Sequence, residues 1–316
     1  MPLIEATNLR KVYKSSAGPV VALDDLNLTV EEGTVRGILG PNGAGKTTTV
    51  KVLTTLLQPD AGAATIDGID VLREPDAVRR IIGASGQYAA LDEKLTAREN
   101  LELFGRLYHL GRATARERAA ELLEAFDLTE AADRPLKGYS GGMRRRIDLA
   151  GSIIIEPRVL FLDEPTTGLD PQSRLGLWDI IRNRVAQGTT VLLTTQYLEE
   201  ADQLADDISV IDHGKVIAEG TADELKAAIG QPRIEIIPAD RGRLPDVQRI
   251  LSQCCDGEIQ VEGGTAVGAV SNATTALQEA LRLFEAEGIE LFDAGLRRPT
   301  LDDVFLQLTG RTNEQA

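Results

Sequence analysis

The chain has 316 residues, of which 42% are hydrophobic and 26% are charged, so it is long enough for one large or two ordinary domains with a buried core. Its 34 lysines and arginines face 49 aspartates and glutamates, and the formal net charge of −15 argues against attraction to nucleic acid or to an anionic membrane surface. The sequence has no stretch of about 18 apolar residues and no basic region followed by an apolar one at its N-terminus, which argues against a membrane-spanning helix and a signal peptide.

The expected elements of the first part alternate between strands and helices. In chain order they are strands and turns over 3–12 and 20–39, a helix from about Gly45, helical residues over 95–127 and after Tyr139, and strands over 159–162 and 191–193. The last two strands and residues 35–39 are short, continuous apolar runs, a pattern typical of parallel strands buried on both faces. The order therefore predicts an α/β fold.

The second part of the chain shows a different order of elements. A hairpin over residues 208–220 is expected to close the first domain, and Gly230-Gln231-Pro232 is interpreted as a linker. The elements expected after it are strand 233–237, helix 244–254, strands 258–262 and 266–270, helix 273–287, strand 289–296 and a last helix that Thr300 and Asp303 begin as a capping pair. This βαββαβ order predicts a small α+β accessory domain of the ferredoxin-like type.

A phosphate-binding motif lies between a predicted strand and a predicted helix. Residues 40–47, Gly-Pro-Asn-Gly-Ala-Gly-Lys-Thr, match G-x-x-x-x-G-K-[ST]. Glycines allow backbone N–H groups to turn toward phosphate oxygens, and the helix N-terminus adds the positive end of its dipole. Lys46 supplies a positive charge and the Thr47 hydroxyl is a ligand for Mg²⁺. An ordinary glycine-rich turn is the alternative, but every fixed position and both flanking elements agree with the motif.

Two acids, Asp163 and Glu164, directly follow the expected strand 159–162. At such a strand end in a P-loop protein, one carboxylate holds Mg²⁺ through water and a second can activate the attacking water. Acids that merely cap a strand are the alternative interpretation. The phosphate-binding motif upstream favours the catalytic one.

Further motifs occur in a fixed order with these two. They are Gln87, Tyr139-Ser140-Gly141-Gly142-Met143, Pro165-Thr166-Thr167-Gly168-Leu169-Asp170 after the two acids, and Thr194-Thr195-Gln196. The set resembles that of the nucleotide-binding subunit of ATP-binding cassette (ABC) transporters, and the resemblance covers roughly residues 3–225.

Three longer segments narrow this resemblance to the daunorubicin-resistance type of bacterial drug-export ATPase. They are Tyr-Ser-Gly-Gly-Met-Arg-Arg-Arg, Leu-Leu-Thr-Thr-Gln-Tyr-Leu-Glu-Glu-Ala-Asp and, near the C-terminus, Pro-Thr-Leu-Asp-Asp-Val-Phe-Leu. The implied fold is a P-loop NTPase, with an ABC nucleotide-binding domain over 1–230, its helical subdomain at about 88–150, and the small α+β accessory domain over 231–316. Arg144 to Arg146 are interpreted as a solvated helix face, with a basic contact patch as the alternative.

The resemblance implies a role for each matching position. Nucleotide contacts are implied for Tyr13, Gly40, Pro41, Asn42, Gly43, Ala44, Gly45, Lys46, Thr47, Thr48, Ser140, Gly141, Gly142 and Asp170. Residues implied to serve Mg²⁺ are Thr47, Gln87 and Asp163, and the implied catalytic residues are Glu164 as general base, Gln196 and Lys46. Tyr13 would stack on adenine, unless it is a core-facing aromatic of its strand.

Some of these contacts are implied to cross between two subunits. Ser140, Gly141 and Gly142 would contact the γ-phosphate held by the opposite subunit, since this helix start offers a hydroxyl, bare N–H groups and a dipole end to an anion. One chain has one phosphate loop and one such segment, so a homodimer, or a pair with a homologous ATPase, would close over two ATP molecules. Asp170 would belong to the dimer-contacting loop, and Gln87 would couple to the membrane partner.

The motifs depart from the commoner family pattern at three positions. Tyr139 and Met143 replace Leu and Gln, and we expect little chemical effect from either. Gln196 occupies the position of the switch histidine; its amide can donate a hydrogen bond to a γ-phosphate oxygen but cannot exchange a proton near neutral pH. Glu164 should therefore be the only general base. Gln196 would either position the phosphate or be a bystander that takes no part in the reaction.

The leading hypothesis is the ATP-binding and ATP-hydrolysing subunit of a bacterial ABC exporter. With ATP and Mg²⁺, it would drive efflux of a hydrophobic drug, antibiotic or lipid-like compound through a separate transmembrane permease. It would lie at the cytoplasmic face of the bacterial cell membrane, in contact with the membrane through the permease only, and would bind no nucleic acid.

Two other classes of protein stay open as alternatives. A soluble ABC-type ATPase of translation or DNA maintenance usually has two cassettes in one chain or a long coiled-coil insertion, and neither is evident in this sequence. A regulatory module whose C-terminal part binds a ligand is the other, although that part has no recognisable ligand constellation.

Overall fold

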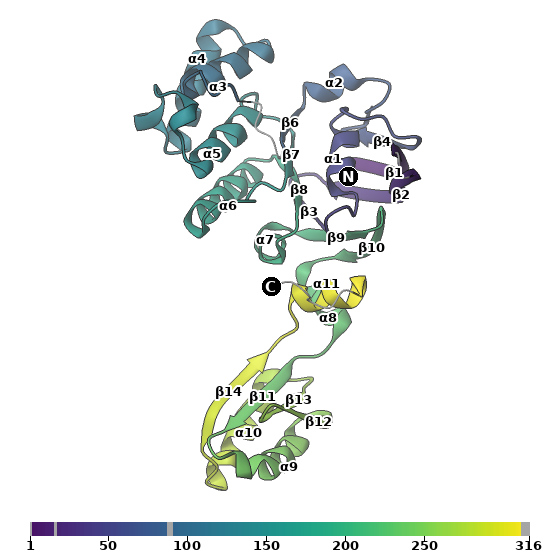
Figure 1. The fold of residues 1–316 in the computed structure, drawn as a ribbon, viewed down its shortest axis with the longest axis vertical. Coiled ribbons are helices and arrows are strands. Elements are labelled where there is room, and N and C mark those ends of the chain that lie inside the picture. The colour runs from purple at the N-terminus through teal and green to yellow at the C-terminus, as the bar shows by residue number, and fades with distance from the viewer. Residues whose placement is uncertain (1, 16–17, 87–90, 311–316) are drawn as a thin grey trace. The chain divides into compact units, whose positions relative to one another are not determined.

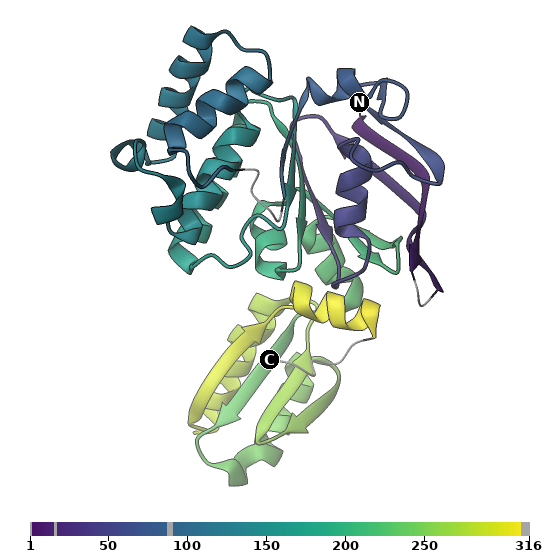
Figure 2. The ribbon, with the colours of Figure 1, turned by 45° about the horizontal axis from the view of Figure 1, so that its top comes forward.

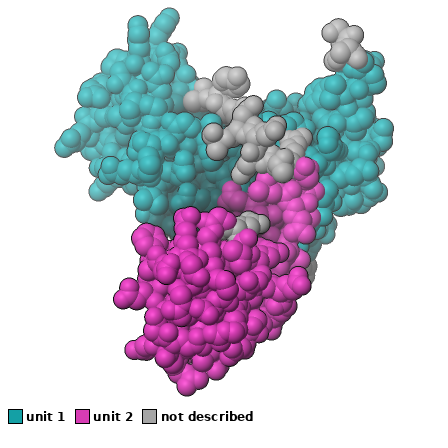
Figure 3. Space-filling view, turned by 60° about the horizontal axis from the view of Figure 1, so that its bottom comes forward, with its two compact units in different colours: residues 1–222 teal, residues 223–316 magenta. Residues whose placement is uncertain are grey.

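The computed structural model describes residues 2–15, 18–86 and 91–310 of the chain. The chain divides into two compact units, residues 1–222 and 223–316 (Figure 3). No helix in the described residues is long and apolar enough to cross a membrane.

A six-stranded sheet forms the centre of the first unit (Figure 1). Its order is β10-β9-β3-β8-β7-β6, and all neighbours are parallel except β10 and β9. The strands are β3 (Val35–Leu39), β6 (Ile82–Ser85), β7 (Val159–Asp163), β8 (Thr190–Thr195), β9 (Asp207–Asp212) and β10 (Lys215–Gly220). Every residue of β7 and β8 is buried, which explains their apolar runs and confirms the predicted α/β fold.

A second sheet in this unit is antiparallel, with the order β2-β1-β4-β5. Its strands are β1 (Pro2–Ser15), β2 (Gly18–Glu31), β4 (Ala61–Ile66) and β5 (Ile69–Asp70). Leu26, Leu28 and Val30 are buried at every second position of β2, and they share one core cluster with Ile38 of β3 and Phe161 of β7. The second sheet therefore covers one face of the central sheet.

Helices surround the sheets of the first unit. They are α1 (Lys46–Leu53), α2 (Pro75–Arg79), α3 (Ala97–Leu107), α4 (Arg112–Ala125), α5 (Gly141–Ser152), α6 (Pro171–Ala186) and α7 (Leu198–Leu204). The helical stretch predicted over 95–127 is interrupted between α3 and α4, where His109 has a φ of 64° that a helix does not tolerate. In two views, α3, α4 and α5 lie across the central sheet from β1, β2 and β4 (Figures 1 and 2).

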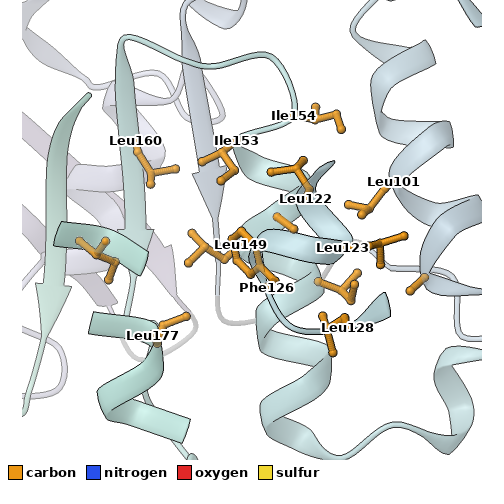
Figure 4. Close-up of a cluster of buried hydrophobic side chains, with 14 of the residues drawn as sticks. Leu101, Leu122, Leu123, Phe126, Leu128, Leu149, Ile153, Ile154, Leu160 and Leu177 are labelled. Atoms are coloured by element: carbon orange, nitrogen blue, oxygen red, sulfur yellow. The ribbon is translucent and has the colours of Figure 1, made fainter. Parts of the chain in front are cut away.

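The helical group is held to the central sheet by shared apolar side chains (Figure 4). Leu101 of α3, Leu122 of α4, Leu149 of α5, Leu160 of β7 and Leu177 of α6 are all buried in one cluster. Burial of each such leucine contributes about 1.5–3 kcal/mol. The shared cluster therefore fixes α5 against β7.

The second unit is a small α+β structure, as predicted. Its elements are α8 (Ala222–Ile229), β11 (Arg233–Pro238), α9 (Leu244–Cys254), β12 (Asp256–Glu262), β13 (Thr265–Ala269), α10 (Ala273–Ala286), β14 (Leu291–Arg297) and α11 (Leu301–Thr309). The sheet order β12-β13-β11-β14 is antiparallel throughout, the arrangement of a ferredoxin-like βαββαβ unit. Thr300 and Asp303 form the expected capping box of α11.

Candidate nucleotide site

The phosphate loop, residues 40–47, leaves the end of β3 and enters α1. Gly43 and Gly45 have φ values of 85° and 114°, which favour glycine. A Cβ on Gly45 would stand 2.6 Å from the carbonyl oxygen of Ala22, so a larger residue would displace the loop. No side chain among the described residues caps the start of α1, so no capping oxygen would compete with an anion for its first N–H groups.

Lys46 places a buried ammonium group inside this loop. Its Nζ donates to the carbonyl oxygens of Gly40 at 2.7 Å and Pro41 at 3.2 Å, and lies 3.7 Å from Oε1 of Glu164. Burial lowers the pKa of Lys46, although the carboxylates of Glu164 and Asp163 act in the opposite direction. A desolvated ammonium gains from a further anionic partner, and a phosphate supplies one.

Asp163 joins three elements at the inner end of the loop. Its Oδ1 accepts hydrogen bonds from the hydroxyl of Thr47 at 3.1 Å and from that of Thr194 at 2.5 Å, which belong to α1 and β8. Carboxylate and hydroxyl oxygens are the hard ligands that Mg²⁺ prefers. The described residues contain no cluster of three or more His, Cys, Asp or Glu side chains that would hold a metal alone. These oxygens therefore fit a Mg²⁺ that takes its remaining ligands from water and phosphate.

Glu164 has a left-handed backbone, with a φ of 49° that is uncommon for residues other than glycine. Its backbone N–H donates to the carbonyl oxygen of Thr194 at 3.0 Å. Its carboxylate is close to Lys46 on one side and accepts a hydrogen bond from the Thr167 hydroxyl at 3.4 Å on the other. The backbone conformation thus directs the carboxylate toward the phosphate loop.

These groups surround one cavity of about 310 Å³. It is lined by Tyr13, Val20, Ala22, Pro41, Asn42, Gly43, Gly45, Lys46, Thr47, Thr48 and Glu164. Tyr13 is 38% exposed, so it lies at the rim of the cavity and is not a core residue of its strand. The cavity combines an apolar and aromatic edge with a phosphate-binding floor, which suits a nucleotide.

The signature segment, residues 140–142, stands apart from this cavity. Ser140 begins α5 and its Oγ accepts a hydrogen bond from the N–H of Met143 at 3.2 Å. Asp170 begins α6 and accepts hydrogen bonds from the N–H and hydroxyl of Ser173, which lower the pKa of Asp170. A Cβ on Gly142 would stand 2.7 Å from Oγ of Ser173, so the two helix starts adjoin each other. None of the described residues that line the cavity comes from either segment.

The two glutamines implied to act at the site are not placed in it. Gln196 follows β8 and is exposed, and it is not among the described residues that line the cavity. Gln87 lies outside the described residues. From β8 it is Thr194 that reaches the site, through its contacts with Asp163 and Glu164.

Two buried charged residues near the site were missed from the sequence. The interpretation of Arg144 to Arg146 as a solvated face is wrong for Arg145, whose side chain is only 12% exposed. Glu200 of α7 is fully buried, accepts a hydrogen bond from the Trp178 indole at 3.2 Å, and has its pKa raised by burial. The signal for Arg145 was Asp148, an acid three residues later among apolar neighbours on the same helix.

Comparison with known proteins gives a consistent result. A sequence model described as ABC transporter matches residues 23–167. A daunorubicin resistance ATP-binding protein of Streptomyces coeruleorubidus is 58% identical over 98% of this chain and 96% of that protein. A daunorubicin/doxorubicin resistance ATP-binding protein of Streptomyces peucetius is 51% identical over 99% of this chain and 96% of that protein.

A solved structure shares the fold of the larger part of the chain. It is the dimer of an ATP-binding cassette bound to ADP and phosphate after hydrolysis, with a TM-score of 0.64 and 28% identity. The match covers 69% of this chain and 98% of that chain.

Proposed function

Because this chain belongs to the family of ATP-binding, ATP-hydrolysing subunits of drug-resistance ABC transporters, we propose that it hydrolyses MgATP in the cavity beside the phosphate loop. The observation that carries the proposal is the convergence of Lys46, Thr47, Asp163 and Glu164 around that loop. An isolated glycine-rich turn would not gather a buried ammonium and two carboxylates at the same place.

Each group has a chemical task in this proposal. Tyr13 stacks on the adenine, while the loop N–H groups and Lys46 hold the β- and γ-phosphates. Thr47 and Asp163 hold Mg²⁺, which neutralises phosphate charge when it is bound. Glu164 accepts a proton from water while the water oxygen forms a bond to the γ-phosphorus. The bond between the γ-phosphorus and the oxygen that bridges the β- and γ-phosphates breaks, which gives ADP and phosphate.

The site is completed by a second molecule. Ser140, Gly141 and Gly142 contact the γ-phosphate held by the opposite subunit, which is a second copy of this chain or a homologous ATPase. The signature segment supports this proposal, because Ser140 and Gly141 are exposed at a helix N-terminus and do not line the chain's own cavity. ATP then favours the closed dimer, and hydrolysis reopens it.

We infer that the dimer drives export through a separate transmembrane permease at the cytoplasmic face of the membrane. The names of its relatives refer to daunorubicin and doxorubicin resistance, which supports a hydrophobic drug, antibiotic or lipid-like compound as the cargo. Gln87 couples the ATPase to the permease in this proposal, and the chain contacts the membrane through the permease only.

Two measurements test the proposal. The full-length chain should release phosphate from ATP when Mg²⁺ is added and should stop when the metal is chelated; hydrolysis without Mg²⁺ would contradict the assigned role of Thr47 and Asp163. The chain should also co-purify from native membranes with a protein that has several membrane spans. Recovery on ribosomes or DNA instead would contradict the export role.

A further inference from the structure

Arg145 of α5 reaches the carbonyl groups of the residues before and after Glu164. Its Nε donates to the carbonyl oxygen of Pro165 at 2.7 Å, and its Nη2 donates to that of Asp163 at 3.2 Å. The N–H of Glu164 itself donates a hydrogen bond to the carbonyl oxygen of Thr194. The left-handed backbone of Glu164 is therefore held by hydrogen bonds at residues 163, 164 and 165, and such a strained conformation persists only when its surroundings fix it in this way.

The same guanidinium also holds the end of β6. Its Nη1 donates to the carbonyl oxygen of Gly86, the residue directly before Gln87, and lies 3.3 Å from Oδ2 of Asp148. Asp148 is buried and accepts a hydrogen bond from the Ser85 hydroxyl at 2.5 Å. One arginine therefore joins the helix of the signature segment, the strand that leads to Gln87, and the turn that carries Glu164.

Only an arginine side chain fits this arrangement of hydrogen-bond acceptors. Four of the guanidinium's five N–H groups are directed to acceptors on three sides, and the planar fork fixes their relative positions. A lysine ammonium has three donors at one point and cannot reach carbonyl groups spread this widely. Burial of the guanidinium lowers the pKa of Arg145, which fits a charge held by neutral carbonyls as well as by Asp148.

We propose that Arg145 is a positioning residue for ATP hydrolysis, which fixes the backbone on both sides of Glu164 and ties it to Gly86 at the end of β6. This inference rests on the proposed role of Glu164 as general base. Arg145 is not among the described residues that line the cavity, and the hydrogen bonds given above lead to Pro165, Gly86, Asp148 and Asp163, none of which belongs to the phosphate loop. Its removal should therefore change the rate of hydrolysis and leave nucleotide binding intact.

The first test compares Arg145→Met, Arg145→Lys and the control Arg144→Met in the full-length chain. Arg144 is the preceding residue of α5 and forms a surface ion pair with Glu93. The Arg144→Met variant therefore loses one positive charge, as Arg145→Met does, but keeps the contacts of Arg145 with the turn of Glu164. We expect kcat to fall about tenfold or more in both Arg145 variants, with KM for ATP changed less than about twofold, and near-normal kcat in Arg144→Met. A normal kcat in folded Arg145→Met would overturn the proposal.

A second measurement does not depend on turnover. Hydrogen exchange of backbone amides in 163–169 should accelerate in Arg145→Met relative to the wild type, while exchange in 40–48 stays unchanged. Equal acceleration in both segments would show a general loss of structure and reject a positioning role. If Arg145→Met does not fold, Asp148→Asn keeps the guanidinium and loosens its anchor, and it should produce the same selective acceleration to a smaller extent; unchanged exchange would reject the proposal.

A double variant separates this inference from the function on which it rests. If Arg145 acts through Glu164, then Arg145→Met should slow the residual hydrolysis of Glu164→Gln by less than about twofold. A further tenfold loss would show that Arg145 acts elsewhere. Full activity of Glu164→Gln alone would instead contradict the proposed function of Glu164.

Discussion

The phosphate loop and the signature segment are both glycine-rich turns at the start of a helix, but their surroundings differ. The phosphate loop leads into α1, whose start has no side-chain cap among the described residues, and it has a buried lysine and two carboxylates beside it. The signature segment is capped by Ser140 and lines no described part of the cavity, and an added Cβ on Gly141 would meet nothing within 4 Å. In the proposed function, the phosphate loop holds the nucleotide of its own chain, and the signature segment serves a nucleotide held by the opposite subunit.

In the proposed function, this difference is the reason that one chain carries the chemistry without completing the site. The groups proposed to act on phosphate, water and metal are joined to one another by short contacts within the first unit. The groups of the signature segment are joined instead to α6, through the close approach of Gly142 and Ser173. A change in either region should therefore affect a different step, and substitutions at four positions test that separation.

Glu164→Gln should have the largest effect, because it removes the general base and retains the shape of the side chain. We expect hydrolysis to fall by about 10²–10⁴-fold while MgATP still binds. Single-turnover phosphate release and equilibrium nucleotide binding measure the two quantities. Turnover at the wild-type rate would remove Glu164 as the base.

Gly142→Asp should block the signature half of the site. Its Cβ would crowd Oγ of Ser173, and its carboxylate would repel the γ-phosphate of the opposite subunit. We expect normal ATP binding, loss of ATP-dependent dimers in size-exclusion chromatography, and at least about tenfold slower hydrolysis. Normal dimerisation with ATP would contradict a signature segment that acts between subunits.

Gln196→Ala should slow hydrolysis only a few-fold, about the loss of one neutral hydrogen bond to phosphate, and Gln196→His should be tolerated. Steady-state kcat of the two variants provides the measurement. An alanine variant with an unchanged rate would favour a bystander role for this exposed residue.

Tyr139→Phe should have the smallest effect and should leave hydrolysis unchanged. Tyr139 is buried, and its hydroxyl donates to the carbonyl oxygen of Ala131 at 2.5 Å. Losing that hydrogen bond should lower the free energy of unfolding by about 1 kcal/mol, measurable as a reduced denaturant midpoint. A slower rate with unchanged stability would show that Tyr139 tunes the signature segment itself.

The parts of the site that were predictable from the sequence are those whose functional residues are adjacent in the chain. The phosphate loop needs its glycines and Lys46 in one run, and Asp163 and Glu164 must follow a buried strand. Periodicity likewise predicted the α/β core and the order of the second unit, because those patterns are local.

The missed features depend on contacts between distant segments. Arg145 is one of three successive arginines, and apart from Asp148 three residues later, what distinguishes it from its neighbours is its set of contacts with the turn of Glu164 and the end of β6. Thr194 is the next-to-last residue of a strand like many others, and its contact with Asp163 comes from the parallel register that sets the two residues side by side. The break near His109 reflects one left-handed residue within an otherwise helical pattern.

The central claim is that the phosphate loop of one subunit works with the signature segment of another. It is tested most directly by mixing equal amounts of Lys46→Met and Gly142→Asp chains, each expected to hydrolyse ATP at least about tenfold more slowly alone, and measuring ATP hydrolysis. If the halves act between subunits, each mixed dimer contains one intact site, and about a quarter of the wild-type rate should return when the sites are independent. If the two segments served the same chain, every chain would remain defective, and the mixture would show no recovery.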